Sequence, residues 1–265
     1  MSISYFKNQL IANLADSTKI NYKAYYHDAI MFDSSVTPSQ GIGIEDFNFN
    51  FNFKNYDSAT QTVPNDPSAN WQQDLVLQGT PVVDTDHITV TNSNAYAQFP
   101  FNSTSENIFN RSSSMGYAMT IIFKIGSTND TSANDLISNR GYCANSNSGG
   151  YDWMVRPQTN TCFLHDSGGQ KCGISYPTRP NIIVMTVNSS AYLTNKSITD
   201  NTSSSGSISL SNLSGRICFF GSNYSNQATN YINEQFTGVC YWMFQANRML
   251  TDDEITQVIN YNENL

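Results

Sequence analysis

Phenylalanine and asparagine alternate strictly over residues 47–53, which read FNFNFNF. Successive side chains of a β-strand point to opposite faces, so this run predicts a strand with four phenyl rings on one face and three amides on the other. A bare row of phenyl rings would promote aggregation, so the ring face must be covered. The strand either packs on the main domain or is covered by another subunit, and we assign an oligomerisation or attachment role to its rings, Phe47, Phe49, Phe51 and Phe53.

The chain from Trp71 onward consists of short apolar or alternating runs separated by clusters of Gly, Asn, Ser and Pro. Many short strands joined by polar turns predict an antiparallel sandwich or barrel rather than alternating βαβ units. Charged residues make up only 13% of the chain, and Asn, Ser and Thr supply much of its polar surface. These side chains favour turns and strands over helix interiors. The fold class is therefore predicted to be mainly β.

One short helix is expected at the C-terminus. Thr251 and Glu254 match a capping box, in which each side chain bonds the other residue's backbone N–H. An apolar stripe at helical spacing follows, formed by Ile255, Val258 and Ile259. We predict a short terminal helix packed on the sandwich.

Three regions are predicted along the chain. Residues 1–60 form an N-terminal arm that contains a helix over residues 4–15. Residues 61–70 carry two prolines and indicate a linker, and residues 71–265 form the sandwich domain.

Residues 236–255 (FTGVCYWMFQANRMLTDDEI) resemble the end of concanavalin A-like, laminin-G-like domains, where an F-x-G strand leads to N-R-x-L-[ST]-x-x-E-I and a short helix. Earlier runs are similar to earlier strands of that family in the same order: residues 118–125, 182–187, 192–196 and 216–221. Lys196 stands where the family has a turn glycine. The resemblance covers about residues 71–262 and implies a two-sheet antiparallel jelly-roll sandwich. Lectins, carbohydrate-binding modules, adhesion domains and glucanases share that fold, so activity must be argued from sites.

Catalytic groups are not indicated. Retaining glycosidases need two carboxyl groups about 5–5.5 Å apart, and glucanases of this fold carry E-x-D-x-[x]-E, with its acids on one strand face. None of the glutamates lies in such a pattern, and Glu254 is used by the helix cap. Asp84 and Asp86 share a strand face beside a turn and are interpreted as a solvated pair. With three histidines and no Gly-x-Ser-x-Gly elbow, the chain is predicted not to be an enzyme.

Net charge, apolar run length and cysteine content limit the classes of partner and the compartment expected for this chain. The formal net charge of −8 argues against nucleic acid binding, and the apolar run 182–187 is far shorter than the ~20 residues of a membrane helix. The N-terminus lacks a signal-peptide pattern, so synthesis in a reducing cytoplasm is expected. The five cysteines contain no CxxC pair and are interpreted as buried free thiols, although a Cys162–Cys172 bridge stays open.

Calcium is considered and not predicted. Asn129, Asp130, Asn134 and Asp135 form one candidate loop, and Asp166 lies in another. Because Asn and Asp are equally the preferred turn residues, the turn interpretation is favoured, and no metal or other cofactor is assigned.

Sugar recognition combines aromatic platforms with amides, carboxylates and guanidinium groups. Two clusters have this composition, and their candidate ligand-binding residues are Tyr142, Asp152, Trp153 and Arg156 in the first and Asn223 and Tyr224 in the second. Neighbouring strand residues point to opposite faces, so the alternative is that Tyr151 and Trp153 are core residues while Asp152 and Arg156 form an exposed pair. For the second cluster the alternative is a polar turn.

The function predicted from these features is a non-enzymatic viral, bacteriophage, structural protein. It would be a fibre, decoration or receptor-binding protein on the virion surface, made in the host cytoplasm, with a lectin-like domain for host or environmental glycans. Its expected partners are copies of itself, by analogy in a trimer, and capsid or tail proteins. The alternatives are a carbohydrate-binding module of a secreted bacterial protein and a glycan-active hydrolase of the same fold.

Overall fold

The chain divides into two units, residues 1–43 and 44–265. The computed structural model describes residues 41–71, 73–91, 95–98, 118–128, 134–138, 153–166, 169–209, 218–221 and 235–265. The helix predicted over residues 4–15 lies outside the described residues. The second unit is the sandwich described below.

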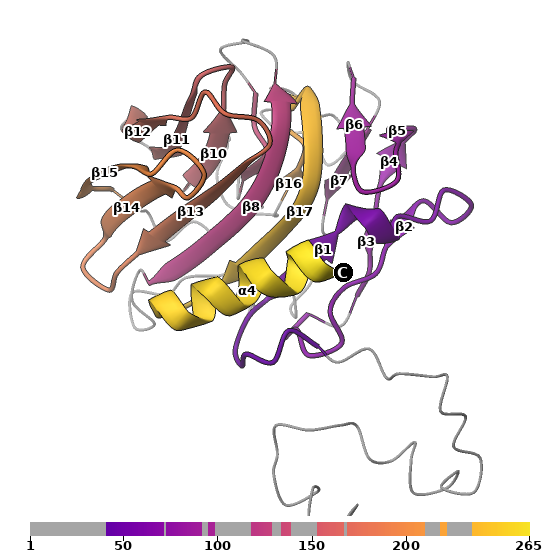
Figure 1. Cartoon of the computed structure of the whole chain (residues 1–265), viewed down its shortest axis with the longest axis horizontal. Helices are drawn as coiled ribbons and strands as arrows, with labels where there is room; N and C mark the ends of the chain where they lie inside the picture. Colours follow the sequence, from indigo (N-terminus) through magenta and orange to yellow (C-terminus); the bar gives the residue numbers. More distant parts are fainter. Residues whose placement is uncertain are drawn as a thin grey trace, which may run out of the picture. The chain divides into compact units, whose positions relative to one another are not determined.

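Two antiparallel sheets form the sandwich (Figure 1). The eight-stranded sheet has the order β15 (Thr202–Ser207), β14 (Tyr192–Ser197), β13 (Asn181–Val187), β8 (Met119–Thr128), β17 (Gly238–Ala246), β6 (Ile88–Val90), β5 (Val82–Val83), and β1 (Phe49–Asn52) also pairs with β17. The seven-stranded sheet has the order β12 (Gly169–Ser175), β11 (Thr161–Asp166), β10 (Trp153–Pro157), β9 (Ile137–Ser138), β16 (Cys218–Phe219), β7 (Ala95–Gln98), β4 (Gln78–Gly79). A small sheet pairs β2 (Thr62–Val63) with β3 (Leu75–Val76), and η1 (Phe53–Asn55) is a 3-10 turn. The predicted sandwich is confirmed.

The core lies between the two sheets. In the eight-stranded sheet Phe123 lies opposite Ile183 and Met243, and all three side chains are buried in the main apolar cluster. Val155 and Leu164 of the seven-stranded sheet belong to the same cluster. Each such side chain contributes roughly 1.5–3 kcal/mol when fully buried. The β-branched and aromatic residues of these runs therefore favour strands that close one apolar layer.

The phenylalanine run is covered by its own chain. Strand β1 begins at Phe49, pairs with β17, and stacks Phe49 on Phe51 with their ring centroids 5.1 Å apart. Both rings meet the edge of Phe219 from the opposite sheet, and Phe53 joins the same core. Phe47 precedes the strand, lies outside this cluster and stacks on Phe244 at 5.2 Å. The prediction of four rings on one face is wrong, because Phe47 lies apart from the other three. The subunit-facing role is also wrong, because all four rings are completely buried within one chain, and the alternative that the strand packs on the main domain is confirmed.

Asparagines on the other face of β1 contact the C-terminal helix α4 (Asp252–Asn264). This helix crosses the outside of the eight-stranded sheet (Figure 1). Asn50 and Asn262 exchange two side-chain hydrogen bonds of 2.9 and 3.2 Å. Asn52 donates to the Asn262 carbonyl at 3.1 Å. All three amides are buried, so their mutual pairing satisfies groups that would otherwise destabilise this layer.

The structure places the domain boundaries differently from the sequence prediction. Residues 44–60 belong to the sandwich unit and not to an arm, because β1 is hydrogen-bonded into its sheet. The predicted linker 61–70 contains β2, and Asn65 forms a bridge with Phe51. The separate N-terminal unit ends at residue 43 instead of residue 60.

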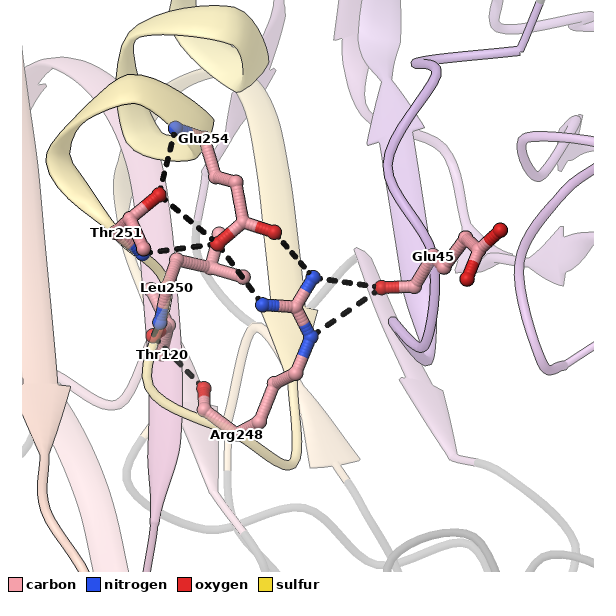
Figure 2. A network of polar contacts seen from close by, with 6 residues as sticks. All are labelled: Glu45, Thr120, Arg248, Leu250, Thr251 and Glu254. Carbon is pink, nitrogen blue, oxygen red and sulfur yellow. Dashed lines mark hydrogen bonds and ion pairs between the residues drawn. The ribbon is translucent and has the colours of Figure 1, made fainter. Parts of the chain in front are cut away.

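The predicted capping box of α4 is present and is extended by Arg248 (Figure 2). The Arg248 guanidinium donates to both carboxylate oxygens of Glu254, at 2.7 and 2.9 Å, and also to the Glu45 carbonyl at 2.8 Å. Hydrogen bonds from Arg248 hold the pKa of Glu254 at about 2, and the Glu254 partner raises the pKa of Arg248. The Thr120 hydroxyl donates to the Arg248 carbonyl and accepts from the Leu250 N–H. This network, the Arg248 clamp, joins β8, the connection from β17 to α4, the start of α4 and the segment before β1.

The structure also explains two further positions of the sequence motifs, Gly238 and Lys196. A Cβ on Gly238 would lie 2.6 Å from the Ser127 carbonyl oxygen, which explains the glycine of the F-x-G strand. No turn occurs at Lys196, since β14 continues to Ser197. Next to it, Asn195 faces the core and donates to the Cys162 and Cys172 carbonyls at 2.9 Å each, linking the two sheets.

The described cysteines, Cys162, Cys172, Cys218 and Cys240, are free thiols, so the Cys162–Cys172 bridge is not formed. Burial raises the pKa of the Cys162 and Cys240 thiols. In the described part of the chain no helix is long and apolar enough to span a bilayer.

Candidate functional site

The outward face of the seven-stranded sheet holds Arg156, one of the two described members of the first predicted cluster. Strand alternation turns Trp153 and Val155 to the core, and it turns Met154 and Arg156 to the opposite face. Register places His165 opposite Met154 and Phe163 opposite Arg156, so these side chains share the outward face. Cys218 joins them through the Met154–Ser138 and Ser138–Cys218 pairs. This group is called the outer sheet face.

A buried ion pair lies at the end of the outer sheet face. Arg156 Nε donates to Asp135 Oδ1 at 2.5 Å, and the two side chains are only 8% and 0% exposed. The Asp135 backbone forms a bridge with Gln235. Because removing one partner of a buried pair leaves an uncompensated charge, at a cost of about 3–5 kcal/mol, the pair fixes β10 against residues 134–138.

The predicted ligand-binding residues separate into two groups. Trp153 is a core residue, as the structural alternative expected, and it is 3% exposed. Arg156 pairs with Asp135 and is buried, so the exposed pair expected with Asp152 is not its role. The remaining candidates lie outside the described residues, and their role stays a prediction: Tyr142, Asp152, Asn223 and Tyr224.

The candidate calcium ligands that the structure describes are engaged by the protein. Asn134 donates to the Pro157 carbonyl at 2.6 Å and accepts from the Thr237 N–H at 2.7 Å. Asp166 accepts from the Ser209 N–H at 2.7 Å and lies 3.9 Å from Lys171 Nζ. Among the described residues, no three His, Cys, Asp or Glu side chains are grouped so that they could hold a metal ion. These contacts use oxygens that a hard cation would need.

Asp84 and Asp86 are solvent-exposed and flank His87. His87 Nδ1 lies 2.7 Å from Asp86, and His87 Nε2 lies 3.8 Å from Asp84. The His87 ring is 5.0 Å from the ring of Tyr241, whose pKa is raised by burial and by the nearby carboxylates. Hydrogen bonding from the Thr85 backbone lowers the pKa of Asp84. The two aspartates therefore hold the His87 imidazole at this turn.

The sequence interpretation missed one exposed surface, which the hairpin of β14 and β15 presents. Tyr192 is 44% exposed there, in a row of hydroxyl side chains. The sequence signal was the alternation of residues 192–196, YLTNK, which predicts that every second side chain points outward. In the structure this strand pairs with the serines of residues 203–207, so the outward side chains form one row.

Comparisons with known proteins bear on the fold. No protein-family model matches the sequence, and no curated protein matches it. A Trypanosoma rangeli sialidase solved in complex with sialic acid is similar in structure, with a TM-score of 0.53 and 10% identity over 93% of this chain. The binding domain of botulinum neurotoxin DC, solved in complex with rat synaptotagmin II, has a TM-score of 0.51 and 12% identity over 82% of this chain.

This chain spans only 38% of the sialidase chain and 51% of the toxin chain. At such identities the likeness establishes the fold alone. The likeness agrees with the mainly β sandwich predicted from the sequence.

Proposed function

We propose that this chain is a non-enzymatic, lectin-like module that binds glycans. The observation that carries the proposal is the outer sheet face, where a buried Arg156–Asp135 pair and the half-buried His165 take positions outside the core. The buried ion pair fixes the end of β10, and a rigid support of this kind suits recognition of sugar hydroxyls by the residues around it. The sialidase with a similar fold was solved with sialic acid bound, which supports a sugar ligand.

The candidate contact residues belong to two chain segments that each follow a strand of the seven-stranded sheet in the sequence. Residue 142 lies in the connection between β9 and β10, and residues 223 and 224 follow β16. Arg156 acts there as a positioning residue, because it is buried and bonded to Asp135. Tyr142 and Tyr224 supply the aromatic platforms predicted from the sequence.

A glycan microarray probed with the full chain and its variants tests this assignment. Tyr224→Ala and Tyr142→Ala should each weaken binding about tenfold without changing the unfolding midpoint. Val82→Ala is the matched control, because it truncates an exposed residue on the other sheet. Unaltered array signals for both tyrosine variants would contradict the proposal.

We further propose that the module belongs to a virion, as a fibre, decoration or receptor-binding protein assembled from several copies with capsid or tail proteins. Two observations support this: residues 1–43 form a unit separate from the sandwich, and 13% charged residues leave a largely uncharged polar chain. An oligomer in mass photometry that is lost on deleting residues 1–43 is the expected result. A monomer in both cases would favour a carbohydrate-binding module of a secreted protein instead.

A further inference from the structure

The outward face of the β14–β15 hairpin carries a row of exposed side chains on the sheet opposite the outer sheet face. Burial alternates along both strands, so every second residue points outward. Register pairs Tyr192 with Ser207, Thr194 with Ser205, and Lys196 with Ser203. We call these six residues the hairpin face.

The ring of Tyr192 lies along the sheet instead of standing upright. Its direct partner is Ser207, yet its hydroxyl is 3.2 Å from the hydroxyl of Ser205, the diagonal neighbour. Diagonal neighbours are about 7–8 Å apart, so a side chain that reaches across this step lies over the strands. One ring face is then turned to the sheet and the other to solvent, which agrees with the 44% exposure.

The hydroxyls around this ring are available. The side chains of Thr194, Ser203 and Ser207 make no hydrogen bond to any residue that the structure describes. They are also short, so they leave the solvent-facing side of the ring open. A flat aromatic surface edged by free hydroxyls can stack on the apolar face of a pyranose and bond its hydroxyl groups.

Charge specifies the ligand further. Lys196 is the only charged side chain on the hairpin face, and it forms no ion pair within the described part of the chain. It stands four residues from Tyr192 on the same strand, about 13 Å away. An unpaired cation in a chain of net charge −8 is complementary to an anionic group.

We propose that the hairpin face is a second glycan site, which binds an acidic oligosaccharide by stacking one sugar ring on Tyr192 and pairing a carboxylate or sulfate of another sugar unit with Lys196. The two contacts are too far apart for one ring, so the ligand is an oligosaccharide. The site uses none of the residues of the outer sheet face, and it stands or falls separately from that assignment.

Binding of the full chain to a microarray of neutral, carboxylated and sulfated oligosaccharides tests the site. Tyr192→Ala should weaken binding of acidic oligosaccharides about tenfold, whereas Tyr192→Phe keeps the ring and should stay within about twofold. Lys196→Gln should remove the preference for acidic over neutral glycans and the salt sensitivity of binding. Lys171→Gln is the charge-matched control on the seven-stranded sheet.

Tyr192 and Lys196 are exposed, and exposed positions tolerate substitution, so their variants should keep the unfolding midpoint of the parent. Acidic glycan signals that survive Tyr192→Ala, or that are absent from the parent chain, would overturn the inference. Signals lost only in Tyr224→Ala and Tyr142→Ala would uphold the first site and refute this one. β15 is also an edge strand, so an oligomer that Tyr192→Ala dissociates would assign the face to a second copy and overturn the glycan assignment.

Discussion

Replacing Glu254 with glutamine removes the negative charge that Arg248 binds, while an amide oxygen remains to accept from the Thr251 N–H. Gln also occurs at this position of capping boxes, so the helix start is kept. The substitution therefore isolates the charge-assisted part of the Arg248 clamp shown in Figure 2.

The magnitude follows from the pKa of Glu254, which falls from 4.5 to about 2 mainly through hydrogen bonds from Arg248. A difference of about 2.5 units at 1.36 kcal/mol per unit gives an upper bound of about 3.4 kcal/mol. The two side chains are 29% and 26% exposed, and solvent screening lowers the expected contribution to about 2 kcal/mol.

The pH dependence has a defined sign. A carboxyl group whose pKa is lowered in the folded state stabilises the protein above its unfolded value, and this stabilisation is lost as the pH falls through the folded value. The parent should thus lose this contribution between about pH 4.5 and pH 2. Glu254→Gln should be about 2 kcal/mol less stable than the parent at pH 7, and the difference should shrink toward pH 2.

Urea denaturation of both proteins at pH 7, 4.5 and 3 measures the difference directly. Asp253→Asn is the control, because it removes one charge from the same exposed first turn, where the structure gives its side chain no ion pair. Equal losses for the two variants at pH 7, or a loss for Glu254→Gln that does not change with pH, would refute the reasoning.

Three other substitutions test the packing. Asn262→Ala should cost about 3 kcal/mol, because it leaves the buried amide of Asn50 without its partner; a loss below 1 kcal/mol in urea denaturation would show that water replaces the contact. Gly238→Ala should cost about 3 kcal/mol, because the added methyl meets the Ser127 carbonyl oxygen; an unchanged thermal midpoint would contradict that. Trp153→Ala should cost about 3–5 kcal/mol by cavity formation, while the molecules that remain folded should keep their glycan signals.

The strands of the core could be predicted because their pattern is local. Residues 118–125 and 181–187 are apolar and β-branched runs bounded by turn residues, and both form strands. The helix start was equally local, since Thr251 and Glu254 are three residues apart. In such cases neighbouring residues determine the structure.

The pairing of β1 could not be predicted, because its partner β17 lies almost two hundred residues away. The seven-residue alternation indicates a strand and a covered face, but not which surface covers it. Its amide face gave no local sign that Asn262 would complete it. Long-range pairing of this kind depends on the whole fold.

The candidate site was only partly accessible from the sequence for the same reason. Alternation correctly separated Trp153 from its neighbours, but the partner of Arg156 is Asp135, twenty-one residues earlier in the chain. Tyr192 was overlooked because no cluster of aromatic residues surrounds it in the sequence. Its surroundings arise from the pairing of β14 with β15.

A crystal structure of the full chain with the oligosaccharide that gives the strongest array signal tests glycan recognition most directly. We predict sugar density beside Tyr142 and Tyr224, or stacked on Tyr192 with an acidic group at Lys196. An oligosaccharide bound only elsewhere, or a folded chain to which no oligosaccharide binds, would contradict the account.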